Sequence, residues 1–201
     1  GARLHGRAAG TFGVAGAFSF YPAKTLGAIG DAGAIVTTDP QLAQQLRSQR
    51  DHGRTETGSV EMWGRNSRLD NLQAAVLLLQ LRYYEADVNR RRSIFERYIE
   101  ELSHIPSIRV PEIDAGGRFD VCQNFEIEAE QRDQLKADLA ARGIGTALPW
   151  GGKAITDFES LQAKDRTPRT SGLMQRLLLL PLHQYLDEDA VTSVIKTDIE
   201  V

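Results

Sequence analysis

Apolar and polar positions in the first third of the chain follow two different periods. Residues 17–21 and 34–38 are short runs rich in aromatic and β-branched side chains, which favour extended strands. Pro22 ends the first run because proline has no N–H to donate to a neighbouring strand. Residues 40–51 place apolar side chains on one stripe and glutamines opposite, and Asp39 precedes them as a helix cap. The pattern predicts strand, loop, strand and helix.

The middle of the chain predicts one long helix from Leu69 to Leu102. Residues 72–81 are apolar almost all round, which is typical of a helix buried in a large core or in a subunit interface. Beyond Tyr84, charged residues dominate and only a narrower apolar stripe remains. The three arginines at 90–92 have acidic neighbours, so we interpret them as a solvated helix face.

The last third changes period again. Residues 119–127 and 144–148 are predicted strands, and residues 131–142 form an amphipathic pattern ended by a glycine. A long loop begins at residue 151, and residues 189–199 predict a final helix. Strand, helix, strand and helix at this size predict a small α/β domain.

Composition and charge narrow the class of protein. Of 201 residues, 41% are hydrophobic and 25% charged, as in ordinary globular domains. The net charge of −3, without a basic block, argues against a nucleic-acid surface. No run approaches the roughly 18 apolar residues that span a bilayer, so we expect no membrane partner. The single cysteine, Cys122, gives no internal disulfide and no metal motif, so we expect the cytoplasm and no metal.

Lys24 is the candidate for covalent chemistry. It follows the aromatic run 17–21 and precedes the glycine-rich stretch 27–33. An amine partly withdrawn from water at such a strand end is deprotonated more easily and becomes nucleophilic. Such a position is the environment that a Schiff-base lysine needs. A solvated lysine in a loop between strands is the alternative that the residues alone leave open.

Four segments in order resemble one family. Residues 18–24 (FSFYPAK) and 66–75 (NSRLDNLQAA) resemble the lysine segment and the N-x-R-x-D-x-x-Q-A-A segment of the DegT/DnrJ/EryC1/StrS sugar aminotransferases. Residues 142–146 and 180–183 resemble two C-terminal landmarks of that family. The resemblance extends over essentially the whole chain. It implies the α/β, PLP-transferase fold (aspartate aminotransferase-like, type I) and the cofactor pyridoxal 5'-phosphate (PLP).

The resemblance implies three residues that hold the cofactor. Lys24 would carry PLP through a Schiff base and act as base and acid in amino transfer. Ser19 would anchor the cofactor phosphate, although a strand-end hydroxyl that bonds the backbone is an open alternative. Asn66 would reach the phosphate of the neighbouring subunit's cofactor.

Three further residues are candidates for substrate binding, and each has a structural alternative. Tyr21 would line the pocket, or be a core aromatic residue. Arg68 would contact substrate across a dimer, or form a salt bridge with Asp70 or a helix terminus. His183 follows an apolar run and would reach the substrate, or be structural. The run 148–154 stands where many members have histidine, tyrosine and proline, so contacts from this loop are not transferred.

The resemblance also implies a division of the chain. Family members run to nearly twice this length, so we expect the C-terminal half of an aminotransferase. Residues 1–85 would be the C-terminal part of the large PLP-binding domain. Residues 86–201 would be a long connecting helix and a small C-terminal α/β domain.

The expected function is transfer of an amino group from an amino acid, with glutamate as donor, to a keto-sugar nucleotide. The expected assembly is a homodimer with shared active sites. Two alternatives stay open. The glycine loop 27–33 would hold a nucleotide phosphate in a binding module, although neither common phosphate-loop motif is present. A truncated, non-catalytic relative would dimerise through residues 72–81.

Overall fold

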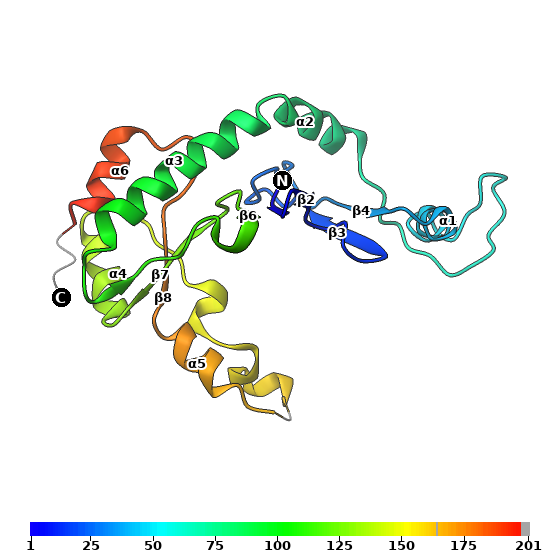
Figure 1. Cartoon of the computed structure of the whole chain (residues 1–201). Helices are drawn as coiled ribbons and strands as arrows, with labels where there is room; N and C mark the ends of the chain where they lie inside the picture. The colour runs from blue at the N-terminus through cyan, green and yellow to red at the C-terminus, as the bar shows by residue number, and fades with distance from the viewer. Residues whose placement is uncertain (164, 198–201) are drawn as a thin grey trace. The chain divides into compact units, whose positions relative to one another are not determined.

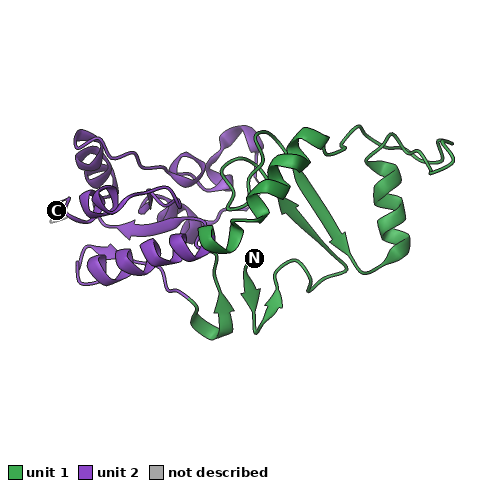
Figure 2. Ribbon diagram, turned by 90° about the horizontal axis from the view of Figure 1, so that it is seen from above, with its two compact units in different colours: residues 1–87, 114–121 green, residues 88–113, 122–201 purple. Residues whose placement is uncertain are grey.

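The computed structural model describes residues 1–163 and 165–197 (Figure 1). The chain divides into two compact units, coloured separately in Figure 2. Unit 1 comprises Gly1–Asp87 and Asp114–Val121, and unit 2 comprises Val88–Ile113 and Cys122–Val201. The candidate residues 19–68 belong to unit 1, whereas His183 belongs to unit 2, so each group is described with its own unit.

Unit 1 contains two small antiparallel sheets. One has the strand order β2-β1-β6, with the strands β1 (Arg3–Leu4), β2 (Arg7–Ala8) and β6 (Arg118–Phe119). The other is a ribbon of β3 (Ala15–Ser19) and β4 (Gly33–Thr37), which pair from Ala15↔Thr37 to Ser19↔Gly33. Both predicted strands are confirmed, each beginning and ending slightly earlier. The regular pairing ends before Pro22, as a residue without an N–H requires.

Helix α1 (Pro40–Gln49) confirms the first predicted helix. Asp39 caps it, since its Oδ1 accepts from the N–H groups of Gln41 at 2.8 Å and Leu42 at 3.2 Å. The helix ends two residues before the predicted end. There the N–H of Gly53 donates to the carbonyl of Ser48 at 2.8 Å, with Gly53 at φ +79°. The cap and the terminal glycine therefore fix the limits of α1.

The single helix predicted over residues 69–102 is wrong, because the structure has two. Helix α2 (Asn71–Leu81) and helix α3 (Tyr84–Leu102) are separated by Arg82 and Tyr83. The N–H groups of those two residues donate to carbonyls only three positions back, at 3.2 and 3.0 Å, so the turn tightens there. The break coincides with the change from an apolar helix to an amphipathic one.

The apolar surface of α2 is open in this chain. Leu77 is its only buried residue among those described, whereas Leu72, Leu78, Leu79 and Leu81 are each more than half exposed. The chain on its own therefore leaves the helix without the apolar cover that its composition predicts.

Unit 2 is an antiparallel sheet with helices. Its strand order is β5-β7-β8, with the strands β5 (Ile108–Arg109), β7 (Phe125–Ala129) and β8 (Leu177–Leu180). Its later helices are α4 (Arg132–Ala141), α5 (Pro168–Met174) and α6 (Glu188–Ile195). Short 3₁₀ turns occupy Ala115–Gly117 in unit 1, and Pro149–Gly152, Ile155–Asp157 and Glu159–Leu161 in unit 2. Figure 1 shows α6 beside α3, where Arg97 donates to the Thr192 hydroxyl at 2.8 Å.

Several limits predicted for unit 2 are corrected. The strand predicted over 119–127 is two strands, β6 and β7, because the intervening residues leave the extended ladder. The strand predicted over 144–148 is wrong: only Ala147 pairs, in an isolated bridge with Leu179. The terminal helix ends at Ile195, and positions 198 and 199 of the prediction lie outside the described residues.

The core of unit 2 forms where α3 covers the sheet. Phe125 of β7 is fully buried and makes edge-on ring contacts with Phe95 at 4.8 Å and Tyr98 at 5.0 Å between centroids. Residues of β7 alternate between buried and more exposed, as expected for a strand with one face on a core. Each large apolar side chain removed from water contributes roughly 1.5–3 kcal/mol. Aromatic packing against α3 therefore holds unit 2 together.

Candidate active site

Lys24 lies in the loop that joins β3 to β4. The loop closes on itself, because the N–H of Ala28 donates to the Phe20 carbonyl at 2.7 Å and the N–H of Lys24 donates to that of Tyr21 at 2.8 Å. Gly27 is required for this closure, since a Cβ there would lie 2.5 Å from the Pro22 carbonyl oxygen. Gly27 and Ala28 are buried, while Lys24 is exposed. The loop therefore presents the amine outward from a fixed base.

Ser19 is the last residue of β3 and directly precedes the loop that carries Lys24. Its Oγ accepts from the N–H of Tyr21 at 3.3 Å, which is the backbone contact that the sequence left as an alternative. This contact does not occupy the hydroxyl proton, and the side chain is exposed. Ser19 therefore keeps a donor for an anionic group.

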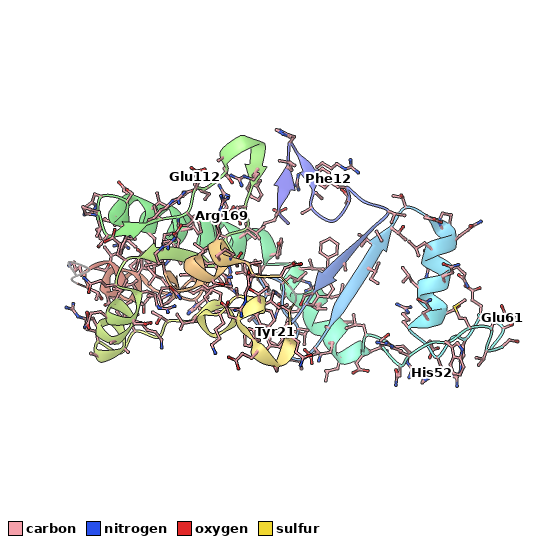
Figure 3. The ribbon with its side chains drawn as sticks, turned by 90° about the horizontal axis from the view of Figure 1, so that it is seen from below. Phe12, Tyr21, His52, Glu61, Glu112 and Arg169 are labelled. Atoms are coloured by element: carbon pink, nitrogen blue, oxygen red, sulfur yellow. The ribbon has the colours of Figure 1, made fainter. Side chains whose placement is uncertain are left out.

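Tyr21 follows the same strand and is labelled in Figure 3. Its side chain is 52% exposed, so it is not a core residue of this chain. The structure places Ser19, Tyr21 and Lys24 on one short segment. The role of Tyr21 in substrate binding stays a prediction.

Asn66 and Arg68 lie on a second segment of unit 1. The N–H of Arg65 donates to the Gln49 carbonyl at 2.7 Å, and Asn66 forms an isolated bridge with Asp51. His52, labelled in Figure 3, donates its N–H to the Arg65 carbonyl at 3.0 Å. The end of α1 therefore holds this segment in an extended form, with the Asn66 side chain exposed.

Arg68 forms its ion pair with an acidic residue other than Asp70. Its Nη1 lies 2.7 Å from Oδ1 of Asp51, with the two side chains 50% and 33% exposed. The structural alternative, a salt bridge with Asp70 or with a helix terminus, is met in its second form: Asp51 directly follows Arg50, the C-cap of α1, and the pair with Asp70 is not formed. Asp51 lies 17 positions away in the sequence, so local spacing gave no signal for this pair.

Gln73 connects the two segments and was not predicted as a site residue. Its Oε1 accepts from the N–H of Ile29, in the lysine loop, at 3.0 Å. Among the described residues, no hydrogen bond directly joins Lys24, Ser19 or Tyr21 to Asn66 or Arg68. The sequence did offer one signal for Gln73, because it lies in the segment 66–75 that resembles the family.

His183 lies in unit 2, on the exposed segment that follows β8. Helix α3 donates to the carbonyls of the two residues that precede it: Tyr98 Oη to Pro181 at 3.0 Å and Arg91 Nη1 to Leu182 at 3.1 Å. Burial, and then the charge of Arg91, lower the pKa of His183 below its usual value. The imidazole is therefore neutral at pH 7 and has one donor and one acceptor.

The prediction that residues 90–92 form a solvated helix face is wrong for Arg91. It is 6% exposed and donates to the Gln184 side chain at 3.0 Å and to the Gln123 carbonyl at 3.2 Å. Its position, three residues before the buried Ile94, places it on the buried stripe of α3. That periodicity was the signal, and the charged composition concealed it.

Two general features of the described residues bear on the site. No three of their histidine, cysteine, aspartate and glutamate side chains gather closely enough to hold a metal ion. None of the helices in the described ranges combines the length and the apolarity needed to cross a bilayer.

The fold is an aminotransferase fold of the α/β class. The crystal structure of a DegT DnrJ EryC1 StrS aminotransferase from Brucella abortus matches with a TM-score of 0.89 and 39% identity, over 96% of this chain and 52% of that one. S. venezuelae DesV in complex with a ketimine intermediate matches with a TM-score of 0.88 and 36% identity, over 98% of this chain and 54% of that one.

The chain belongs to the DegT/DnrJ/EryC1/StrS aminotransferase family, whose model matches residues 1–197. The dTDP-3-amino-3,4,6-trideoxy-alpha-D-glucose transaminase of Streptomyces venezuelae is 36% identical over 97% of this chain and 52% of its own length. A UDP-N-acetyl-3-dehydro-alpha-D-glucosamine 3-aminotransferase of Acidithiobacillus ferrooxidans is 36% identical over 96% and 52%. The chain thus spans about half the length of these relatives. The predicted family and fold class are confirmed.

The side chains of the lysine loop fit PLP, the cofactor of this family. Lys24 offers a primary amine on an exposed residue to an aldehyde, and Ser19, at the strand end before the loop, offers a hydroxyl donor to a phosphate. A ligand with an aldehyde and a phosphate therefore has complementary groups on Lys24, in the closed loop, and on Ser19, at the strand end that precedes it.

Proposed function

We propose that this chain supplies the lysine-bearing half of a PLP-dependent aminotransferase. The reaction would move an amino group from an amino acid, with glutamate as donor, to a keto-sugar nucleotide. Its product would enter amino-sugar, surface-polysaccharide or natural-product biosynthesis. The observation that carries the proposal is the outward presentation of Lys24 on a closed loop beside Ser19, in a chain of this family.

Lys24 and Ser19 would hold the cofactor, which when bound supplies an electron sink for the substrate. Lys24 has a second task, because the transfer moves a proton between two carbon atoms. Its Nζ would take that proton and return it, as a general base and then a general acid. A residue with two tasks at one atom tolerates no replacement that removes the amine.

Arg68 and Asn66 would act across a homodimer with shared active sites. Both side chains are exposed on a segment that the end of α1 holds extended. The open leucines of α2 supply an apolar surface next to that segment. Tyr21 and His183 would contact the substrate, and the neutral imidazole of His183 would accept or donate a hydrogen bond without adding charge.

The division of the chain forms part of the proposal. Residues 1–85 would belong to the large PLP-binding domain, and residues 86–201 to the connecting helix and the small domain. The β3–β4 ribbon supports this view, because two strands alone are marginally stable and its residues Ile35 and Val36 are 53% and 43% exposed. We also propose the cytoplasm as the location, since the sequence has one cysteine, Cys122, which is buried and forms no disulfide within the chain.

The test is Lys24→Ala in the full-length enzyme that the proposal implies, with Lys136→Ala as control. Lys136 lies on the helix α4 of unit 2, away from the loop in sequence. We expect Lys24→Ala to abolish amino transfer from glutamate to keto-sugar nucleotides and Lys136→Ala to retain it. Normal turnover by Lys24→Ala would contradict the proposal. An inactive wild-type protein that still dimerises would favour the non-catalytic relative.

A further inference from the structure

We propose that Gln73 is a positioning residue for Lys24. From the first turn of helix α2, its side-chain amide would hold the loop that carries the lysine. The chemistry of Lys24 rests on the proposed function, whereas the attachment itself rests only on the contacts of Gln73.

The attachment is a hydrogen bond between residues 44 positions apart. The N–H of Ile29 donates to Oε1 of Gln73 at 3.0 Å. Ile29 directly follows Ala28, whose N–H closes the loop onto the Phe20 carbonyl. The side chain of Ile29 is 62% exposed, so apolar packing contributes little to fixing this residue in place. The bond therefore lies at the point where the lysine loop closes.

Gly30 gives a second observation of the same contact. A Cβ at Gly30 would lie 2.6 Å from Nε2 of Gln73. Gly30 has no left-handed backbone conformation, so a residue with a Cβ fits the backbone there, and the end of the Gln73 side chain would have to move to make room for it. The amide of Gln73 therefore meets two consecutive residues of the loop: Oε1 binds one N–H, and Nε2 lies against the next Cα.

The bond has a consequence for the lysine because it adds a contact with a helix to the hydrogen bonds through which the loop closes on itself. The loop projects from a two-stranded ribbon, which is a weak scaffold by itself. A reacting amine must be held closely, since a displacement of about 1 Å costs roughly a hundredfold in rate. Helix α2 also follows directly on the segment of Asn66 and Arg68. Gln73 would thus fix Lys24 relative to the residues expected to serve the partner's site.

The first experiment measures amide exchange at Ile29 in the chain itself. Gln73→Met keeps the length of the side chain and the helix propensity but removes the acceptor. We expect Ile29 to exchange about two- to tenfold faster, as the loss of one net hydrogen bond implies. Gln73→Glu keeps an acceptor and should retain the slow exchange. Gln80→Met, on the same helix and at a residue with no side-chain hydrogen bond among those described, is the control.

Gly30→Ala tests the same contact from the loop side. Alone, its methyl group should displace the Gln73 amide and speed exchange at Ile29 as much as Gln73→Met does. In a Gln73→Ala background the space is open, so Gly30→Ala should add nothing. Equal exchange in wild type and Gln73→Met, or additive effects of the two substitutions, would overturn the attachment whether or not Lys24 binds a cofactor.

The positioning role has its own measurement. The full-length enzyme, freed of any bound cofactor, is treated with PLP and borohydride, and the ratio of labelled Lys24 to labelled Lys136 is measured by peptide mass spectrometry. We expect Gln73→Met to lower this ratio severalfold and Gln73→Glu to restore it. An unchanged ratio with faster Ile29 exchange would overturn positioning and leave a structural bond. If wild-type Lys24 is labelled no more than Lys136, the proposed function fails and the positioning role fails with it.

Discussion

Arg68 offers a test in which stability and function are expected to separate. Its ion pair with Asp51 is short, at 2.7 Å, but both partners are substantially exposed. Exposed pairs of this kind contribute roughly 0–1 kcal/mol. Arg68→Ala should therefore change the free energy of unfolding by less than about 1 kcal/mol. If Arg68 contacts the diphosphate of a nucleotide sugar, losing that charged hydrogen bond costs about 1.5–3 kcal/mol.

The second figure corresponds to an increase of roughly 10- to 150-fold in KM for the nucleotide sugar, at about 1.4 kcal/mol per tenfold. Urea unfolding and steady-state kinetics of the full-length enzyme measure the two quantities. Asp51→Asn is the matched control, because it breaks the ion pair but leaves the cation. It should keep KM within a few-fold. A KM that is unchanged in Arg68→Ala, or raised equally in Asp51→Asn, would refute the substrate role and leave a structural pair.

Three further outcomes are expected. Phe125→Ala removes the centre of the aromatic cluster and should lower the free energy of unfolding of unit 2, measured in urea, by about 3–5 kcal/mol. Leu72→Ala, at an exposed site, should change it by no more than about 0.5 kcal/mol. Equal effects of the two substitutions would contradict the described core. Burial raises the pKa of Tyr98 to about 12, above its unfolded value of 10.0. The free energy of unfolding should therefore be unaffected by this group below pH 10 and fall between pH 10 and 12 by up to about 1.4 kcal/mol per pH unit. Tyr98→Phe should remove this fall, and the same fall in wild type and Tyr98→Phe would contradict the assignment. Leu78→Glu, on the exposed face of α2, should weaken self-association of the full-length enzyme in sedimentation experiments, whereas Ile155→Glu in unit 2 should not. A full-length enzyme that is monomeric without substitution would exclude the dimer with shared active sites.

Local signals in the sequence predicted local structure well. The presence of β3 follows from the aromatic run that Pro22 ends, and the start of α1 follows from the Asp39 cap. These signals act within a few residues, so they need no knowledge of the rest of the chain. The break between α2 and α3 was missed because Arg82 and Tyr83 are ordinary helix residues. Neither a proline nor a glycine marks the break, so no local signal predicted it.

Contacts between distant segments were beyond local reasoning. The partner of Arg68 is Asp51 and that of Ile29 is Gln73, and neither distance has a period that a pattern reveals. Arg91 was misread because a buried arginine that donates to carbonyls has the same composition as a solvated one. The predicted strand at 144–148 failed for a similar reason: its apolar residues pack beside β8, but only Ala147 pairs with it.

The central claim is that Lys24 is the residue that carries the cofactor. Reduction of the full-length enzyme with borohydride as purified, without added cofactor, followed by peptide mass spectrometry, tests it most directly. The account predicts a pyridoxyl group on the peptide containing Lys24 and on no other lysine. A pyridoxyl group on another lysine with Lys24 unmodified, or a fully active enzyme without any labelled lysine, would contradict it.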